Sequence, residues 1–124
     1  MRVRYAETDR IGVVYYANYL VWFEVARAEL LRTTGWTYRE MEAAGVMLPV
    51  IEAHCKYQKP ARYDDEVEIR TIGRLTSAVR MEFAYDVVLK ATGQIAAVGS
   101  TVHAAIDVEG RPCRLPDRIR EVFS

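Results

Sequence analysis

The spacing of apolar residues changes along the chain, from a helical period at the start to an alternating one later. The segment 13–34 contains neither glycine nor proline. Apolar residues recur in it at intervals of three and four, as on one face of a helix: Leu20, Phe23, Ala26 and Leu30. Gly35 follows at once, where glycine commonly ends a helix. We predict one long helix here, and because its apolar residues extend beyond one stripe, we expect it to be largely buried.

Shorter elements flank this helix. Val3 and Tyr5 alternate with Arg2 and Arg4, which predicts a short first strand. Residues 37–40, Thr-Tyr-Arg-Glu, have the form of a capping box and predict a short helix from there to residue 44. Residues 115–123 are predicted to form a terminal helix with a proline near its first position.

Most of the remaining chain alternates between apolar and polar residues, as strands do. The predicted strands cover 51–58, 66–71, 79–89 and 95–106. The last is rich in small residues with little alternation, which indicates burial on both faces and a central place in the sheet. We therefore predict an α+β fold in which an antiparallel sheet of about five strands wraps around the long helix. One helix cannot cover both faces, so the other face or an edge is a candidate for subunit contact.

Length and charge narrow the class of protein further. The chain of 124 residues fits one domain, 1–124. Lys plus Arg and Asp plus Glu are 17 each, so a nucleic-acid partner is not expected, while the zero net charge favours an oligomer. Cys55 and Cys113 lie far apart, and we expect reduced thiols in a cytoplasmic protein. We expect no signal peptide, and no membrane span, because no segment approaches ~20 apolar residues.

Several kinds of chemistry have no support in the sequence. His54 and His103, the only two histidines, lie on separate predicted strands, so we expect structural roles and no metal site. The chain has no G-x-S-x-G nucleophile motif and no glycine-rich phosphate loop, so we expect no bound cofactor. Cys55 falls on the apolar side of its strand and is expected to pack in the core. Glu24 and Arg27 are expected to pair with each other or with the sheet.

The strongest candidate for chemistry is the loop 7–12, which holds two carboxylates and a glycine just before the long helix. The start of a helix carries free N–H groups and partial positive charge. A carboxylate such as Asp9 could face an electrophile held by those groups, as acyl transfer requires. The alternative is that Asp9 only caps the helix. For Glu7 we expect a solvated loop residue.

Two ordered motifs extend this interpretation. The first, from Tyr5 to Arg32, is Y-A-E-T-D-x-x-G-V-V-Y-Y-A-N-Y-L-x-x-F-E-x-A-R-x-E-L-L-R. The second, from Tyr57 to Ile69, is Y-x-K-P-A-R-Y-D-D-E-V-E-I. Together they resemble the 4-hydroxybenzoyl-CoA thioesterase family, most closely the small bacterial acyl-CoA thioesterases that accompany the Tol-Pal envelope system.

The resemblance implies a hotdog fold and an enzyme that hydrolyses the thioester of a small or medium acyl-CoA. It implies dimers that join sheets edge to edge, often paired into homotetramers, with active sites at the dimer interface. Asp9 would be the catalytic carboxylate, acting as nucleophile or as general base. The Tyr16 backbone N–H would polarise the carbonyl; several relatives carry histidine there, which leaves a role only for the backbone. Gly12, in the same motif, is a candidate substrate-binding position.

The binding of CoA is less well defined by the sequence. Arg62, in the second motif, and Arg74, in a predicted turn, are candidates to hold its phosphates, with solvated surface charge or a structural ion pair as the alternative. The acyl group is not determined. Two other functions remain open: a non-catalytic acyl-binding or scaffold protein on the same fold, and a dehydratase acting on hydroxyacyl chains, although neither histidine lies in a suitable motif.

Overall fold

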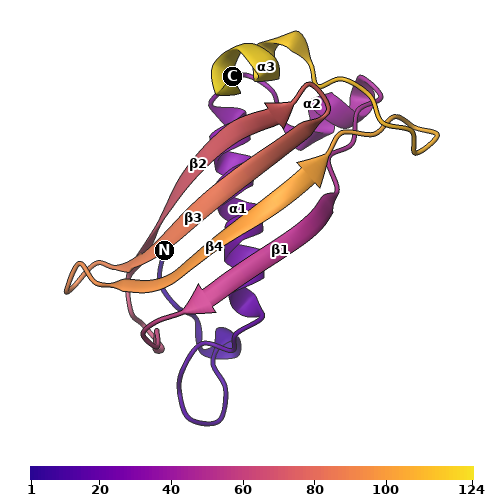
Figure 1. Ribbon diagram of the computed structural model, residues 1–124. Helices are drawn as coiled ribbons and strands as arrows, with labels where there is room; N and C mark the ends of the chain where they lie inside the picture. The colour runs from indigo at the N-terminus through magenta and orange to yellow at the C-terminus, as the bar shows by residue number, and fades with distance from the viewer.

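An antiparallel sheet curves around one long helix in the computed structural model, which describes residues 1–124 (Figure 1). The strands are β1 (Val50–Tyr57), β2 (Val67–Ser77), β3 (Arg80–Leu89) and β4 (Ile95–Ala104), in the spatial order β1-β4-β3-β2. The helices are α1 (Asn18–Arg32), α2 (Tyr38–Ala43) and α3 (Asp117–Phe123), after a 3₁₀ turn at Tyr5–Glu7. The predicted α+β class is confirmed, but the sheet has four strands rather than five.

β4 occupies an interior position of the sheet, between β1 and β3. Its small residues explain this place, since Ala96 and Ala97 are fully buried. At Gly99 a Cβ atom would lie 2.5 Å from the Phe23 ring, so glycine lets α1 approach the sheet closely. The predicted central place of this strand is confirmed, but its burial on both faces is not, because Val98, Ser100 and Val102 remain partly exposed.

α1 lies against the sheet and buries one face only. Phe23 is fully buried, and its ring stacks on Tyr85 of β3 with centroids 4.3 Å apart. Elsewhere on the helix Leu20, Val21 and Val25 are 41, 50 and 48% exposed. The expectation of a largely buried helix is therefore wrong for a single chain, because one sheet covers only one side of the helix.

The start of α1 was predicted too early. The helix begins at Asn18, whereas Val13 and Val14 run in extended conformation. Val14 N–H donates to the Ala61 carbonyl at 2.8 Å, and Tyr15 N–H donates to the Glu7 carbonyl at 2.8 Å. Because these N–H groups already donate to carbonyls of other loops, an earlier start of the helix would bring them no additional hydrogen bonds.

The predicted first strand is not a strand. Val3 N–H donates to the Asp65 carbonyl at 2.9 Å, so the N-terminal segment runs beside the start of β2, but its pairing is limited to one bridge between Arg2 and Glu66. The chain then turns into the 3₁₀ segment at Tyr5, too soon for a ladder to form.

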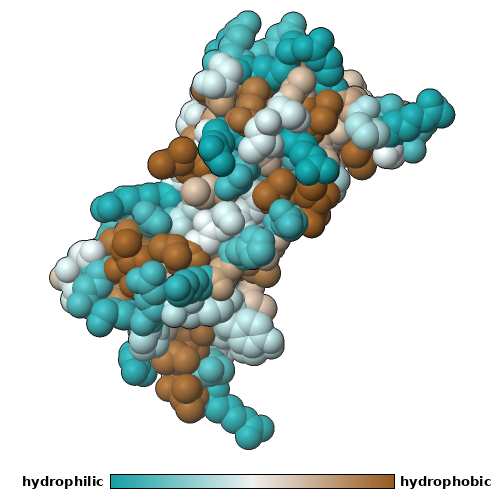
Figure 2. Space-filling view, in the orientation of Figure 1, coloured by the Kyte–Doolittle hydropathy of each residue, from teal (hydrophilic) through white to brown (hydrophobic).

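Other local predictions are confirmed. Thr37 caps α2 by accepting a hydrogen bond from Glu40 N–H at 3.2 Å. Cys55 is half-buried and packs against the core. None of the helices is long and apolar enough to cross a membrane. On the sheet face turned away from α1, apolar patches are interrupted by hydrophilic side chains (Figure 2).

Candidate active site

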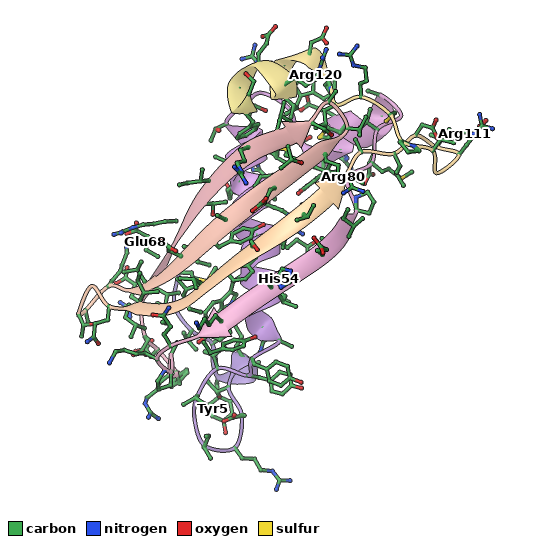
Figure 3. The ribbon with its side chains drawn as sticks, viewed as in Figure 1. Tyr5, His54, Glu68, Arg80, Arg111 and Arg120 are labelled. Atoms are coloured by element: carbon green, nitrogen blue, oxygen red, sulfur yellow. The ribbon has the colours of Figure 1, made fainter.

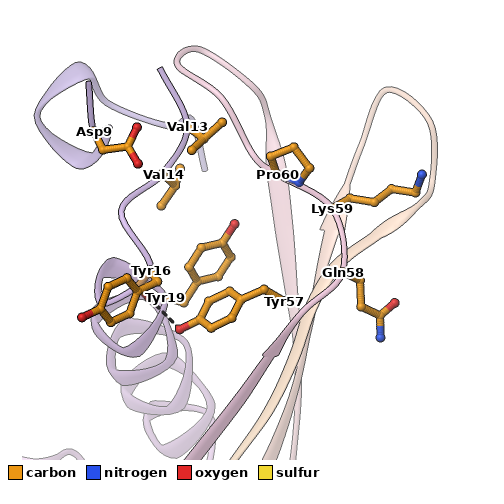
Figure 4. A pocket seen from close by; sticks show the side chains of 9 residues that line it. All are labelled: Asp9, Val13, Val14, Tyr16, Tyr19, Tyr57, Gln58, Lys59 and Pro60. Atoms are coloured by element: carbon orange, nitrogen blue, oxygen red, sulfur yellow. Dashed lines mark hydrogen bonds between the residues drawn. The ribbon is translucent and has the colours of Figure 1, made fainter. Parts of the chain in front are cut away.

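A cavity of about 360 Å³ opens where α1 begins, beside the loop that precedes it and the segment that follows β1 (Figure 4). The cavity brings together residues of the two sequence motifs, which are far apart along the chain. Its walls are made by Asp9, Val13, Val14, Tyr16, Tyr19, Tyr57, Gln58, Lys59 and Pro60.

Asp9 is held in a tight loop by its own backbone. Its N–H donates to the Val13 carbonyl at 2.8 Å, and its carbonyl accepts from Gly12 N–H at 3.1 Å. Gly12 has a φ of +82°, a left-handed conformation that glycine adopts without strain. Oδ1 of Asp9 accepts from Ile11 N–H at 2.9 Å, and the carboxylate faces the cavity (Figure 4). The other carboxylate oxygen, Oδ2, accepts no hydrogen bond within the chain.

The capping alternative for Asp9 is wrong. Ala17 occupies the N-cap of α1 and makes no side-chain cap bond. Asp9 lies well before that position, on a separate loop, and its carboxylate accepts a hydrogen bond only from Ile11 N–H. Its place in the cavity wall is therefore not explained by helix capping.

Tyr16 lies just before α1 and presents an unused backbone donor. Its N–H donates to no group of the chain, while its carbonyl accepts from the Tyr57 hydroxyl at 2.9 Å. The dashed line in Figure 4 marks this bond. A free N–H at the positive end of a helix is suited to bind a polarised carbonyl oxygen or an anion.

Aromatic rings form one wall of the cavity. The rings of Tyr19 and Tyr57 meet edge to face with centroids 5.1 Å apart, and Tyr16 and Tyr57 are 6.4 Å apart. Burial, reinforced by the neighbouring Cys55 thiol, raises the pKa of Tyr57 to about 12. The Tyr57 hydroxyl therefore stays protonated and remains a donor to Tyr16 across the neutral range.

The residues proposed to bind substrate do not line this cavity. Gly12 shapes the Asp9 loop. Arg62 is exposed, and its backbone N–H donates to an Asp65 carboxylate oxygen at 2.8 Å. Arg74 lies inside β2 rather than in a turn, and its guanidinium is 3.3 Å from a Glu82 carboxylate oxygen. Binding roles for these three residues remain predictions.

Sequence reasoning missed Tyr57 and Lys59 as cavity residues. Both belong to the second motif, which was used to choose Arg62 instead. Only the folded chain shows that the segment after β1 lies next to the Asp9 loop. As a result Lys59, rather than Arg62, is one of the residues of the cavity wall. The motif was a signal for the segment but not for the individual side chain.

Glu7 is buried, so the expectation of a solvated loop residue is wrong. It is 6% exposed, and its carboxylate accepts from the Trp22 indole N–H at 2.7 Å and from Arg4 N–H at 2.8 Å. Burial raises the pKa of Glu7, but these hydrogen bonds and the nearby Arg4 charge outweigh it, so the pKa lies below its usual value.

The two histidines differ in burial. His54 is exposed on β1 (Figure 3). His103 is fully buried between the Leu48 carbonyl at 3.0 Å and the Thr101 hydroxyl at 2.8 Å, and burial lowers its pKa to about 4.

Arg27 is also buried and bonds to the sheet as expected. Its Nη1 donates to the Tyr85 hydroxyl on β3 at 3.3 Å, and its Nε donates to the Tyr38 hydroxyl at 3.1 Å. Glu24 makes no ion pair with it. No group of histidine, cysteine, aspartate and glutamate side chains is arranged to hold a metal ion.

Comparison with known proteins defines the class. The crystal structure of DHNA-CoA thioesterase from Staphylococcus aureus superposes with a TM-score of 0.90 at 32% identity, covering 98% of this chain and 87% of that one. The fold is thus the hotdog fold of thioesterases, as the sequence predicted. The model of the thioesterase-like superfamily matches residues 3–123, so the chain belongs to that family of thioester hydrolases.

Two further relatives agree. YneP of Bacillus subtilis (strain 168), which carries a provisional acyl-CoA thioesterase name, is 36% identical over 109 residues, or 88% of this chain and 78% of YneP. The acyl-CoA thioester hydrolase YbgC of Escherichia coli O157:H7 is 41% identical over 71 residues, 57% of this chain and 53% of YbgC. The resemblance stated from the sequence is confirmed at the level of the family.

Proposed function

We propose that this protein is an acyl-CoA thioesterase that converts a small or medium acyl-CoA and water into a free acid and CoA. The observation that carries the proposal is that Asp9, whose carboxylate faces the cavity, and Tyr16, whose backbone N–H has no acceptor in the chain, line the same cavity. One group can supply or activate a nucleophile while the other stabilises the oxyanion, which are the two requirements of acyl transfer. Neither His54 nor His103 lines the cavity, so a dehydratase has no such support.

The reaction follows from these two groups. The thioester carbonyl oxygen accepts a hydrogen bond from Tyr16 N–H, a kind of contact that contributes about 2.7–4 kcal/mol to the transition state. Asp9 either takes a proton from water, whose oxygen bonds to the carbonyl carbon, or attacks that carbon itself to give an anhydride that water then cleaves. The carbon–sulfur bond breaks, and the thiolate of CoA leaves with the electron pair and takes up a proton.

The cavity also suits the two ends of the substrate. A volume of about 360 Å³ with tyrosine walls matches a small or medium acyl group. Lys59 belongs to the cavity wall, and its ammonium group points outward from the cavity (Figure 4). Lys56, in β1, and Arg62, after it, are further exposed cations in this part of the sequence. These cations can neutralise the phosphates of CoA at the mouth of the site.

A second copy of the chain would complete the site. β1 is the edge strand beside the cavity, and every residue in it except Cys55 is exposed. Edge strands with free N–H and C=O groups are prone to pair with another chain. In a two-fold antiparallel pairing, the first residues of the second β1 would lie beside Tyr57, so each cavity would gain a wall from the other subunit. Two such dimers could pair further into the tetramer expected from the sequence.

A thiol-release assay with a panel of aromatic, short and medium acyl-CoAs tests the proposal. We expect turnover by the native protein and a loss of about 10²–10⁴-fold in kcat for Asp9→Asn, the range associated with a catalytic acid or base. Asp86→Asn, on β3 outside the cavity, is the matched control and should keep full activity. Saturable acyl-CoA binding without thiol release would overturn the proposal in favour of a binding protein.

A further inference from the structure

Glu7 connects the Asp9 loop to the helix that follows it. Glu7 comes two residues before Asp9 in the sequence. Its carboxylate accepts a hydrogen bond from the indole N–H of Trp22, in the second turn of α1, at 2.7 Å. The other carboxylate oxygen accepts from Arg4 N–H at 2.8 Å, which fixes the turn in which Glu7 lies. Glu7 and Trp22 are 6 and 2% exposed, so water does not compete strongly for these bonds.

The backbone of Glu7 makes a second connection. Its carbonyl accepts from Tyr15 N–H at 2.8 Å and from the Asn18 side-chain amide at 2.9 Å. These donors lie on either side of Tyr16, the residue that the proposed function assigns as the oxyanion donor. One residue therefore holds the segment that carries Asp9 and the segment that carries the oxyanion donor at fixed positions.

Burying a carboxylate in a core costs free energy, because the charge loses its hydration. Two apolar side chains would occupy the space between the loop and α1 without the desolvation of a charge, and such replacements are often neutral or stabilising. The carboxylate adds direction, because Oε2 accepts from Trp22 along a defined line while Oε1 accepts from Arg4 N–H and lies 3.5 Å from the Arg4 guanidinium. The arrangement is therefore better explained by placement of the loop than by stability alone.

We propose that Glu7 is a positioning residue for thioester hydrolysis, which holds the Asp9 carboxylate and the Tyr16 N–H on opposite sides of the substrate carbonyl. This inference rests on the proposed function. Misplacement of reacting groups by about 1 Å can cost about 10²-fold in rate. Loss of the contact between Glu7 and Trp22 should therefore lower kcat without removing any group that touches the substrate.

The test compares Glu7→Leu and Glu7→Gln with the native protein under saturating acyl-CoA, at a temperature where thermal melts show each protein fully folded. We expect kcat to fall on the order of 10²-fold in Glu7→Leu, while KM changes by less than about threefold. Glu7→Gln keeps one acceptor for Trp22 and should recover part of that loss. Nuclear magnetic resonance of the Trp22 indole N–H should show faster exchange in Glu7→Leu.

Thr34→Val is the matched control for a buried polar contact. Thr34 is 2% exposed and donates to the Leu31 carbonyl at 2.6 Å, but it lies beyond the other end of α1. This variant should lower the melting temperature and leave kcat unchanged. Full kcat in folded Glu7→Leu would overturn the positioning role while leaving the proposed function intact. If the native protein releases no thiol, both fail, and the parallel native sample identifies that case.

Discussion

His103 shows at the scale of one residue how the core of this protein depends on pH. The imidazole is fully buried and bonded on both nitrogens, to Leu48 and Thr101. The Thr101 hydroxyl also shares a hydrogen bond of 2.7 Å with the Tyr85 hydroxyl. The Tyr85 hydroxyl in turn accepts a hydrogen bond from the Arg27 guanidinium. A proton added to His103 would therefore place a second positive charge in the network that already holds the Arg27 guanidinium.

We predict that the protein loses stability as the pH falls from 6.5 to about 4 because of His103. Its pKa drops from 6.5 to about 4 on folding, so the unfolded chain binds more protons in this window and acid favours unfolding. The expected loss between pH 7 and pH 5 is about 2 kcal/mol. Urea unfolding at several pH values measures it.

Two histidine variants test the assignment of this pH dependence. His103→Gln should be less stable at pH 7, having lost packing and hydrogen bonds, but it should show a shallower loss in acid. His54→Gln, at the exposed histidine on β1, should keep the native pH dependence. An unchanged acid slope in His103→Gln would contradict the assignment.

Predicting individual residues from sequence found one cavity residue through its motif and failed where burial or the path of the chain decided a residue's place. Asp9 was identified from its motif, and it does line the cavity. Glu7, two residues earlier, was expected in solvent, because nothing in the local sequence shows that the Trp22 indole will cover it. Lys59 was overlooked for a similar reason, since the path of the chain after β1 decides which cation reaches the wall.

At the scale of elements, the contact between α1 and β4 sets how closely helix and sheet approach. Phe23 stacks on the Tyr85 ring and also packs over Gly99, which is paired with Tyr85 on the neighbouring strand. A Cβ at position 99 would come within 2.5 Å of the Phe23 ring and 2.7 Å of the His54 carbonyl oxygen. Neither neighbour is free to move, because one is packed in the core and the other belongs to the β1 backbone.

We predict that Gly99→Ala destabilises the protein by about 1–3 kcal/mol, the usual range for an overpacked core. The helix would have to lift from the sheet, which would also shift the start of α1 at the cavity. Denaturant unfolding measures the stability loss. Ser100→Ala, at the next position of the same strand, should change the stability by less than about 0.5 kcal/mol. Equal stability of both variants would show that α1 is more loosely packed than the structure indicates.

At the scale of the whole molecule, one side of the chain exposes apolar side chains and an unpaired strand edge. The exposed apolar residues of α1 and the free edge of β1 both bear on the proposed dimer. A cavity between α1 and β1 spans them, lined by Leu20, Val21, Glu24, Arg27, Val50, Ala53 and Thr101. Association of two copies would bury this surface and remove the unpaired strand edge.

We predict that Val21→Glu shifts the protein toward the monomer, because it places a charge in the centre of this apolar surface. Analytical ultracentrifugation should show the mass fall from that of an oligomer to that of one chain, and the thioesterase rate should fall with it. Val108→Glu is the control, since Val108 is 76% exposed in a distant turn. A native protein that is monomeric and fully active would contradict the composite site.

The sequence by itself determined the order and type of most elements, because hydrophobic periodicity reports which face of a helix or strand is buried. It determined the family and singled out Asp9 as a candidate as well, because both follow from ordered motifs. Only the tertiary structure decided where α1 begins, that Glu7 is buried against Trp22, and that Tyr57 and Lys59 join Asp9 in one cavity. These features depend on contacts between segments far apart along the chain, and local periodicity carries no information about such contacts.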